Sequence, residues 1–153
     1  MEQYVREAAI EDLDGLVDIR CAFLNSLERS DVSNLPIVTR AWLEQHLKNG
    51  SFKAWITEID GKIVSCSGLM IKDYPPGYMH APDGLEGYIL NIFTLPEYRG
   101  KGLAGLMMKH IVAYLRKMGI HRATLHATEE ARGLYERYGF KSTHTEMEWL
   151  LEA

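Results

Sequence analysis

Several features are scarce or missing in this chain of 153 residues, and each absence excludes a class of protein. It contains two cysteines, Cys21 and Cys66, without the short spacing of a metal site or a disulfide framework. No apolar run approaches the roughly 20 residues that span a membrane, and the residues after Met1 form no signal-peptide pattern. The formal net charge of -4 provides no broad basic surface for nucleic acid. We therefore expect a cytoplasmic protein that has no metal site and binds neither nucleic acid nor membrane.

The remaining composition is that of an ordinary globular chain. Hydrophobic residues make up 46% and charged residues 25%, which are common values for folded domains. The length is close to the usual domain size, and no repeat, low-complexity segment or linker interrupts the chain. Residues 1–153 are therefore expected to form a single domain.

Local patterns predict alternating strands and helices. The predicted strands cover 4–8, 52–59, 62–71, 85–95, 122–128 and 141–151, and the predicted helices cover 12–27, 40–48, 102–118 and 130–138. Loops are expected over 30–38 and 73–84, and Asp60-Gly61 predicts a hairpin turn. Early antiparallel strands followed by a strand-helix-strand unit predict a mixed α/β sheet, with a right-handed crossover between parallel strands.

The most informative segment is a glycine-rich loop that leads from the predicted strand 85–95 into the predicted helix 102–118. Its sequence is Arg99-Gly100-Lys101-Gly102-Leu103-Ala104-Gly105. Glycines lack the Cβ atoms that would hold backbone amides away from a phosphate. Amides at a helix start point toward an anion at the positive end of the helix dipole, and Arg99 and Lys101 add positive charge. The loop therefore predicts a site for a phosphorylated carrier.

A dinucleotide site is one alternative, because Gly100 to Gly105 also fits the pattern Gly-x-Gly-x-x-Gly. In that fingerprint the glycines form the tight turn directly after a strand, whereas here residues 96–99 intervene. The glycines also begin two thirds of the way along the chain, which leaves no room for a full dinucleotide domain. A P-loop is excluded because no Gly-Lys-Ser/Thr has the required spacing.

Two motifs, in this order, resemble the GNAT (Gcn5-related) N-acetyltransferases, which use acetyl-CoA. Arg99 to Ala104 fits that family's pattern Arg/Gln-x-x-Gly-x-Gly/Ala, and Leu134-Tyr-Glu-x-x-Gly-Phe140 resembles its Leu-Tyr-Glu-x-x-Gly-Phe ending. The predicted order β-α-α-β-β-β-α-β-α-β is also similar to the GNAT fold. The resemblance implies an N-acetyltransferase that uses acetyl-CoA as cosubstrate and transfers the acetyl group directly to a primary amine.

The resemblance also implies roles for particular residues. Backbone amides of Ile92, Phe93 and Thr94 would bind pantetheine and the thioester oxygen, and a β-bulge there would leave amides free for this. Tyr135 is the candidate general acid, since a phenol with a pKa of about 10 stays protonated at neutral pH. Its spacing alone slightly favours a core residue, since it shares a face with Leu134 and Tyr138. Thr128 stands where many members carry asparagine, and it would contact pantetheine or cap the following helix.

The general base is the second catalytic assignment. An alkylammonium has a pKa of about 10.4, so its proton must be removed before the amine attacks. Glu86 is the candidate base, acting through water, although the family's glutamate aligns better with Tyr88. His80 and His126 are alternatives.

The acceptor would bind, by the same resemblance, between residues 20–40 and 73–87. Acidic and aromatic side chains in the second segment suit a cationic amine: Asp73, Tyr74, Tyr78, His80, Asp83 and Glu86. This points to a small amine, an aminoglycoside-like compound, or a peptide or lysine amine. Members of the family are often dimers, which leaves a homodimer open. The alternative function is a non-catalytic CoA-binding sensor or interaction module of the same fold.

Overall fold

A computed structural model describes residues 4–27, 34–78 and 83–151. Its strands are β1 (Val5–Glu7), β2 (Phe52–Ile59), β3 (Lys62–Asp73), β4 (Leu85–Thr94) and β5 (Ala123–Leu125). They form one sheet in the order β1-β2-β3-β4-β5, antiparallel except for the parallel pair β4–β5. The mixed sheet and the parallel pair predicted from the sequence are thus confirmed.

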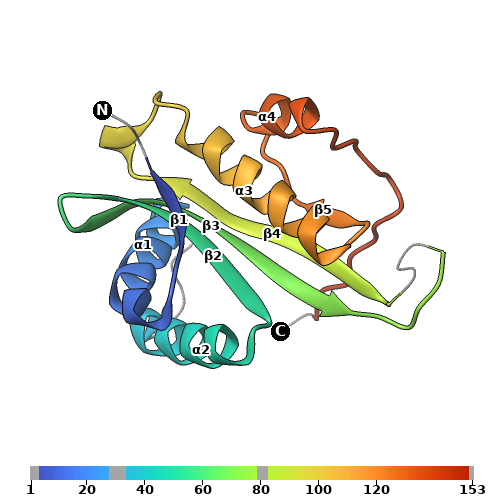
Figure 1. Ribbon diagram of the computed structural model, residues 1–153, viewed down its shortest axis with the longest axis horizontal. Helices are drawn as coiled ribbons and strands as arrows, with labels where there is room; N and C mark the ends of the chain where they lie inside the picture. Colours follow the sequence, from blue (N-terminus) through green and yellow to red (C-terminus); the bar gives the residue numbers. More distant parts are fainter. Residues whose placement is uncertain (1–3, 28–33, 79–82, 152–153) are drawn as a thin grey trace.

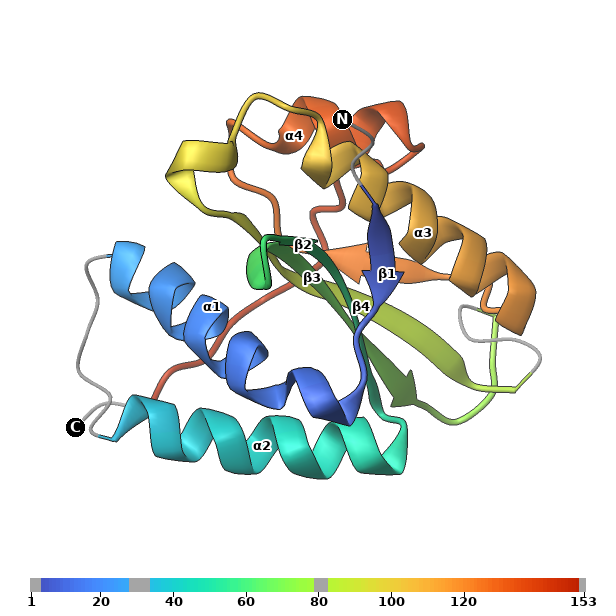
Figure 2. The same cartoon turned by 60° about the vertical axis from the view of Figure 1, so that its left-hand side comes forward.

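Helices cover both faces of this sheet (Figure 1). One face carries α1 (Leu13–Ser26) and α2 (Leu35–Asn49), and the other carries α3 (Leu103–Met118), with α4 (Arg132–Arg137) following β5 (Figure 2). Each face has its own buried apolar cluster. None of the described helices combines the length and apolar character needed to cross a bilayer.

The predicted turn and helix ends have the backbone conformations that their residues favour. Asp60 and Gly61 have φ values of 52° and 79°, as a two-residue hairpin with a type I′ turn requires. The helix α3 begins after Gly102 and ends before Gly119, and both glycines are left-handed. These local signals therefore set the ends of the elements that surround the glycine-rich loop.

The second helix begins earlier than the sequence patterns predict. It starts at Leu35, so the expected loop over 30–38 is wrong for residues 35–38, while residues 30–33 lie outside the described part. Pro36 lies in the first turn of α2 and not in a loop. A proline is tolerated there because the amide that it lacks would have no partner within the helix.

The final strand predicted over 141–151 is wrong. These residues have no regular secondary structure, and they run from α4 past β5 toward the α2 side of the sheet (Figures 1 and 2). Alternating side chains predicted a strand, but a strand also needs a neighbour, and β5 is only three residues long. As a result, large apolar side chains stay exposed: Met147, Trp149, Leu150 and Leu151.

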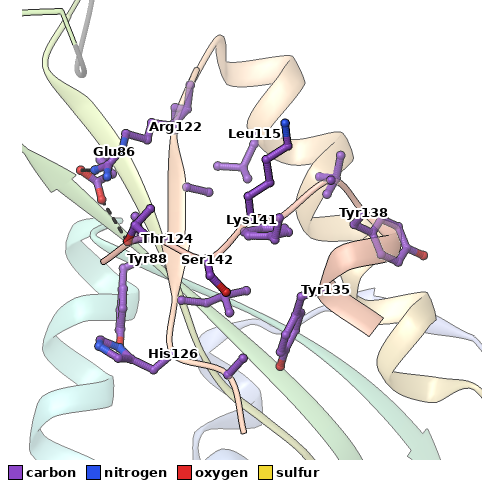
Figure 3. A pocket seen from close by; sticks show the side chains of 18 of the residues that line it. Glu86, Tyr88, Leu115, Arg122, Thr124, His126, Tyr135, Tyr138, Lys141 and Ser142 are labelled. Carbon is purple, nitrogen blue, oxygen red and sulfur yellow. Dashed lines mark hydrogen bonds and ion pairs between the residues drawn. The ribbon is translucent and has the colours of Figure 1, made fainter. Parts of the chain in front are cut away.

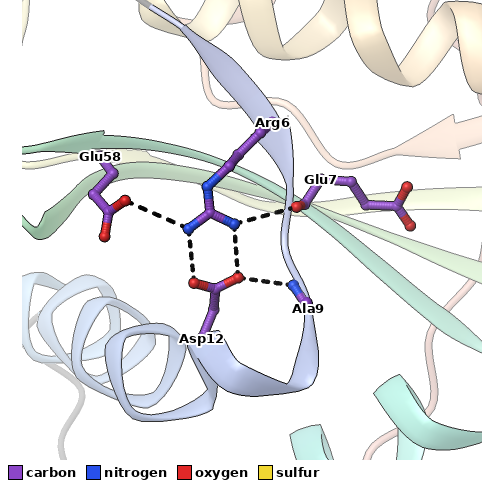
Figure 4. Close-up of polar contacts among 5 residues, drawn as sticks. All are labelled: Arg6, Glu7, Ala9, Asp12 and Glu58. Carbon is purple, nitrogen blue, oxygen red and sulfur yellow. Dashed lines mark hydrogen bonds and ion pairs between the residues drawn. The ribbon is translucent and has the colours of Figure 1, made fainter.

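A cluster of hydrogen bonds around Asp12 joins β1 to the residue that precedes α1 (Figure 4). The Arg6 guanidinium donates two hydrogen bonds to the Asp12 carboxylate, at 2.9 and 2.8 Å. The Ala9 amide donates a third to Asp12, at 2.8 Å. These bonds hold the pKa of the Asp12 carboxyl below its usual range, chiefly through Arg6.

Candidate active site

A β-bulge interrupts β4 where the sequence analysis expected one. Phe93 pairs with Cys66 and Leu90 with Gly68, so Asn91 and Ile92 together lie opposite Ser67 alone. Asn91 has a left-handed φ of 60°. β4 pairs with β5 only over Gly87–Ile89 and 123–125, so the two strands are no longer paired at the bulge and beyond it. The segment 92–94 therefore lies at a splayed end of two parallel strands.

The glycine-rich loop follows this splayed end after one short 3-10 helix, Pro96–Tyr98. Gly100 and Gly102 have φ values of 79° and 77°, and a Cβ built on either would meet nothing within 4 Å. The left-handed backbone conformation, and not crowding, is therefore what favours glycine at both positions. The space beside the backbone at both glycines is open. Such space suits the diphosphate of a CoA molecule, with the amides at the start of α3 directed toward it.

Arg99 is tied to the end of β4. Its Nε donates to the carbonyl oxygen of Thr94 at 2.9 Å, and its guanidinium lies 5.5 Å from the centre of the Phe93 ring. These two contacts hold a positive charge beside the loop. They also connect the segment expected to bind pantetheine with the segment expected to bind phosphate.

Tyr135 is a buried residue of α4, and its ring packs into the apolar cluster beneath α3. Its hydroxyl makes no hydrogen bond to another described residue, and burial raises its pKa above the ordinary value of 10. Tyr138 projects in another direction (Figure 3) and donates to the carbonyl oxygen of Gly105 at 2.9 Å, which fastens α4 to the first turns of α3. The ring of Tyr135 is thus a core group, while its hydroxyl keeps its proton.

Thr128 starts the turn that leads into α4. Its hydroxyl accepts a hydrogen bond from the Ala131 amide at 3.3 Å, and its carbonyl oxygen accepts from Ala131 and Arg132 at 3.1 and 3.0 Å. Thr128 therefore closes the turn before α4, whose own N-cap residue is Ala131. Contact with a cofactor at this threonine stays a prediction.

Glu86 is held by its neighbours at the far end of β4 (Figure 3). Only 3% of it is exposed; Arg122 donates to one carboxylate oxygen and Thr124 to the other, each at 3.0 Å. Five residues of β4, among them the left-handed Asn91, separate it from Ile92, so the two lie up to about 20 Å apart. These contacts favour a structural role, and the prediction that Glu86 is the base gains no support from its position.

Tyr88 and His126 form a pair; the sequence analysis named His126 as an alternative base and Tyr88 only as the position that aligns with the family's glutamate. The Tyr88 hydroxyl lies 2.6 Å from Nδ1 of His126, whose Nε2 lies 3.2 Å from a carboxylate oxygen of Glu146. His126 follows Leu125, which pairs with Ile89, so it lies level with Leu90 and close to the bulge. Burial, and then the charge of Glu146, raise the pKa of Tyr88. No periodicity in the sequence could reveal this pair, because it joins two strands across the parallel ladder.

A pocket of about 820 Å³ opens along the free edge of β5, between α3, α4 and the segment that replaces the expected final strand. Glu86, Tyr88, His126 and Tyr135 all line it. In the loop before β4, Tyr78 is fully exposed, whereas His80 lies outside the described residues. The structure thus gathers the catalytic candidates of β4, β5 and α4 around one opening.

Together, the sheet splayed at its β4–β5 junction and the left-handed glycines at the start of α3 define a domain that binds a phosphorylated carrier. The model of the GNAT acetyltransferase family matches residues 16–140. The chain therefore belongs to the GNAT acetyltransferase family, as its motifs suggested.

Solved structures agree with this assignment. A predicted acetyltransferase of Clostridium acetobutylicum, solved with acetyl-CoA, has a TM-score of 0.88 at 28% identity, over 97% of this chain and 96% of that one. A GCN5-related N-acetyltransferase of Ralstonia eutropha has a TM-score of 0.84 at 32% identity, over 98% and 99% of the two chains. An amino-acid acetyltransferase of Pseudomonas putida is 28% identical over 144 residues, 94% of this chain. That match covers only 29% of the relative, so the chain spans less than a third of its length.

Proposed function

We propose that this protein is a single-domain N-acetyltransferase that transfers an acetyl group from acetyl-CoA directly to a primary amine. The observation that carries the proposal is the pair of left-handed glycines, Gly100 and Gly102, beside the splayed end of β4. The family and the related structure that contains acetyl-CoA support the same cosubstrate. Acetyl-CoA supplies the acetyl group as a thioester.

In this proposal the two ends of the carrier bind to consecutive segments of the chain. The diphosphate is held by backbone amides of Gly100, Gly102, Leu103, Ala104 and Gly105, together with the charges of Arg99 and Lys101. Backbone amides of 92–94 hold pantetheine and polarise the thioester carbonyl. Thr128 contributes a hydroxyl from the turn before α4. Supporting this order, Arg99 bonds to Thr94, so the two binding segments are joined.

Tyr135 acts as the general acid. At neutral pH a phenol, with a pKa of about 10, and a thiol, with a pKa of about 8.5, are both mostly protonated, so Tyr135 can donate a proton to the leaving thiolate and regain one from solvent. The raised pKa of Tyr135 keeps that proton in place at neutral pH. Its hydroxyl makes no hydrogen bond to another described residue, which leaves it available to this partner.

The Tyr88–His126 pair accepts the proton of the acceptor amine, in place of Glu86. A neutral imidazole is a suitable base near pH 7, and the carboxylate of Glu146 orients its second nitrogen. Glu86 then stabilises the β4–β5 junction through Arg122 and Thr124.

Self-association belongs to the proposal as well. The exposed apolar side chains between 147 and 151 lie on a segment without regular structure that runs toward the α2 side of the sheet (Figures 1 and 2). A homodimer would cover such a surface, and sedimentation of the full chain measures it directly. The cytoplasmic setting expected from the sequence stays a prediction.

The test is release of CoA from acetyl-CoA, followed with a thiol reagent, against a panel of amino acids, amino sugars, polyamines and peptides. We expect Tyr135→Phe to reduce turnover by roughly 100-fold or more, with acetyl-CoA affinity almost unchanged. Calorimetry measures that affinity. Tight binding without turnover would favour the sensor alternative, and failure to bind acetyl-CoA would overturn the assignment of the glycine-rich loop.

A further inference from the structure

Arg20 lies among the apolar residues of α1 that face the sheet. It is half-buried, and its Nη1 donates to Oδ1 of Asn91, the left-handed residue of the β4 bulge, at 3.2 Å. The guanidinium lies 5.9 Å from the centre of the Phe23 ring. The cationic side chain of Arg20 thus points along the α1 face of the sheet toward the bulge, and not outward into solvent.

This cation has no anionic partner within the described part of the chain. The ion pairs there engage Arg6, Arg40, Arg122 and Arg132 with carboxylates, and Arg20 is in none of them. A guanidinium has five N–H donors, and a half-buried one without an anion is unfavourable. Accordingly, burial lowers the pKa of Arg20. A bound anion would remove this imbalance.

The position of Arg20 connects it with the reacting end of the carrier. Asn91 precedes Ile92, the first of the residues whose amides are assigned to the thioester. Because neighbouring Cα atoms are about 3.8 Å apart, the guanidinium lies within about 10 Å of that amide. Tyr88 and Leu90 are two residues apart on β4, so both face the side of the sheet that α1 covers. The Tyr88–His126 pair and Arg20 therefore lie on the same side of the strand.

We propose that the acceptor carries an anionic group, a carboxylate or a phosphate, a few bonds from its amine, and that Arg20 binds this group. The inference rests on the proposed acetyltransferase function and narrows its substrate class. A planar guanidinium can donate two parallel hydrogen bonds to either anion, and lysine cannot reproduce that geometry. Polyamines and neutral amino sugars are thereby disfavoured as acceptors.

The test compares matched acceptors with and without an anionic group: glutamate against its diamide, and glucosamine 6-phosphate against glucosamine. The first pair tests a carboxylate and the second a phosphate. We expect the wild type to prefer the anionic member of at least one pair. Arg20→Gln should raise KM for that acceptor and lower kcat/KM by roughly 30-fold or more. Arg20→Lys, which keeps the charge, should recover only part of the loss.

Two controls separate binding from folding. Lys48→Gln removes an exposed cation of α2 that pairs with Glu44 and lies outside the segments assigned to the acceptor, and it should leave both acceptor preferences unchanged. The melting temperature of each variant with CoA bound shows whether the fold and the carrier site are intact. Equal use of charged and neutral acceptors, or an equal loss on both in Arg20→Gln, would overturn the inference.

If no acceptor in the panel reacts, inorganic phosphate and glutarate serve as probes of the protein saturated with CoA, whose diphosphate then occupies the loop. Stabilisation by either anion that disappears in Arg20→Gln would support the inference, and its absence would overturn it. Failure to bind acetyl-CoA would instead overturn the proposed function. The anion probes can still be compared between wild type and Arg20→Gln in that case, so the two failures are distinguishable.

Discussion

Replacing Glu86 with glutamine separates a structural carboxylate from a catalytic base. The substitution keeps the shape of the side chain but removes the charge-assisted hydrogen bond that Arg122 donates at 3.0 Å. Such a bond contributes about 2 kcal/mol to the free energy of unfolding. Arg122 is 31% exposed, so water can solvate it once the charge of its partner is gone. For a chain of this length, the loss corresponds to a fall in melting temperature of roughly 4–8 °C.

The accompanying kinetic expectation is a small change. Because Glu86 is separated from the bulge by up to about 20 Å of strand, kcat/KM for CoA release should change by less than about threefold. Arg122→Met removes the guanidinium that pairs with the 3%-exposed carboxylate but leaves the carboxylate charge in place, so it should destabilise the fold more than Glu86→Gln does. Glu136→Gln removes an exposed carboxylate from the same pocket and should change neither quantity. If Glu86→Gln instead slowed turnover by about two orders of magnitude at unchanged melting temperature, this reasoning would be refuted and Glu86 identified as a base.

Three further predictions concern the general acid Tyr135, the hydrogen bonds around Asp12 and the glycine-rich loop. Because burial raises the pKa of Tyr135, kcat/KM should not fall below about pH 10 through ionisation of this residue. A fall in kcat/KM below about pH 10 that is present in wild type and absent in Tyr135→Phe would contradict this prediction. Asp12→Asn should lower the free energy of unfolding by about 1 kcal/mol at pH 7. Since the folded-state pKa of Asp12 is lowered, its contribution is present above the unfolded-state value of about 4 and declines as pH falls from there through the folded-state value. Urea titrations of wild type and Asp12→Asn should therefore converge as pH falls below about 4, and a difference that stays constant would be inconsistent. Gly102→Ala should cost about 1 kcal/mol in its left-handed conformation and weaken acetyl-CoA binding about tenfold by calorimetry, whereas Gly77→Ala, at an uncrowded position without a positive φ, should do neither.

Local chemistry was sufficient to predict the elements whose ends depend on their own residues. Asp60-Gly61 favours a hairpin turn and Gly119 favours a helix end through their own left-handed conformations, so the sequence was sufficient to place both. Pro36 could not be resolved in the same way, because a proline suits a loop as well as a first helical turn. The strand expected at 141–151 failed for another reason: pairing depends on what the rest of the sheet offers.

The site shows the same division. The glycine-rich loop and Tyr135 were identified from contiguous motifs, whereas the Tyr88–His126 pair depends on the register between β4 and β5. Arg20 did leave a signal, since it falls within the apolar stripe of α1, where a charged residue is unusual. Its partner Asn91 is 71 positions away, and only the folded chain brings the two together.

The bulge in β4 also changes how the strand must be counted. Leu90 and Phe93 both face the α1/α2 cluster although they are three residues apart, and Ile89 and Ile92 likewise both face α3. The strand is therefore two half-strands joined out of phase. Deleting the single residue Asn91 would restore regular alternation and leave Ile92 and Phe93 on their present faces, so the packing on the two sides of the sheet does not depend on the extra residue. The deletion would instead remove the left-handed residue of the backbone and, with it, the hydrogen-bond partner of Arg20. The extra residue therefore changes the backbone at the reacting end of the strand without changing which side chains form the core.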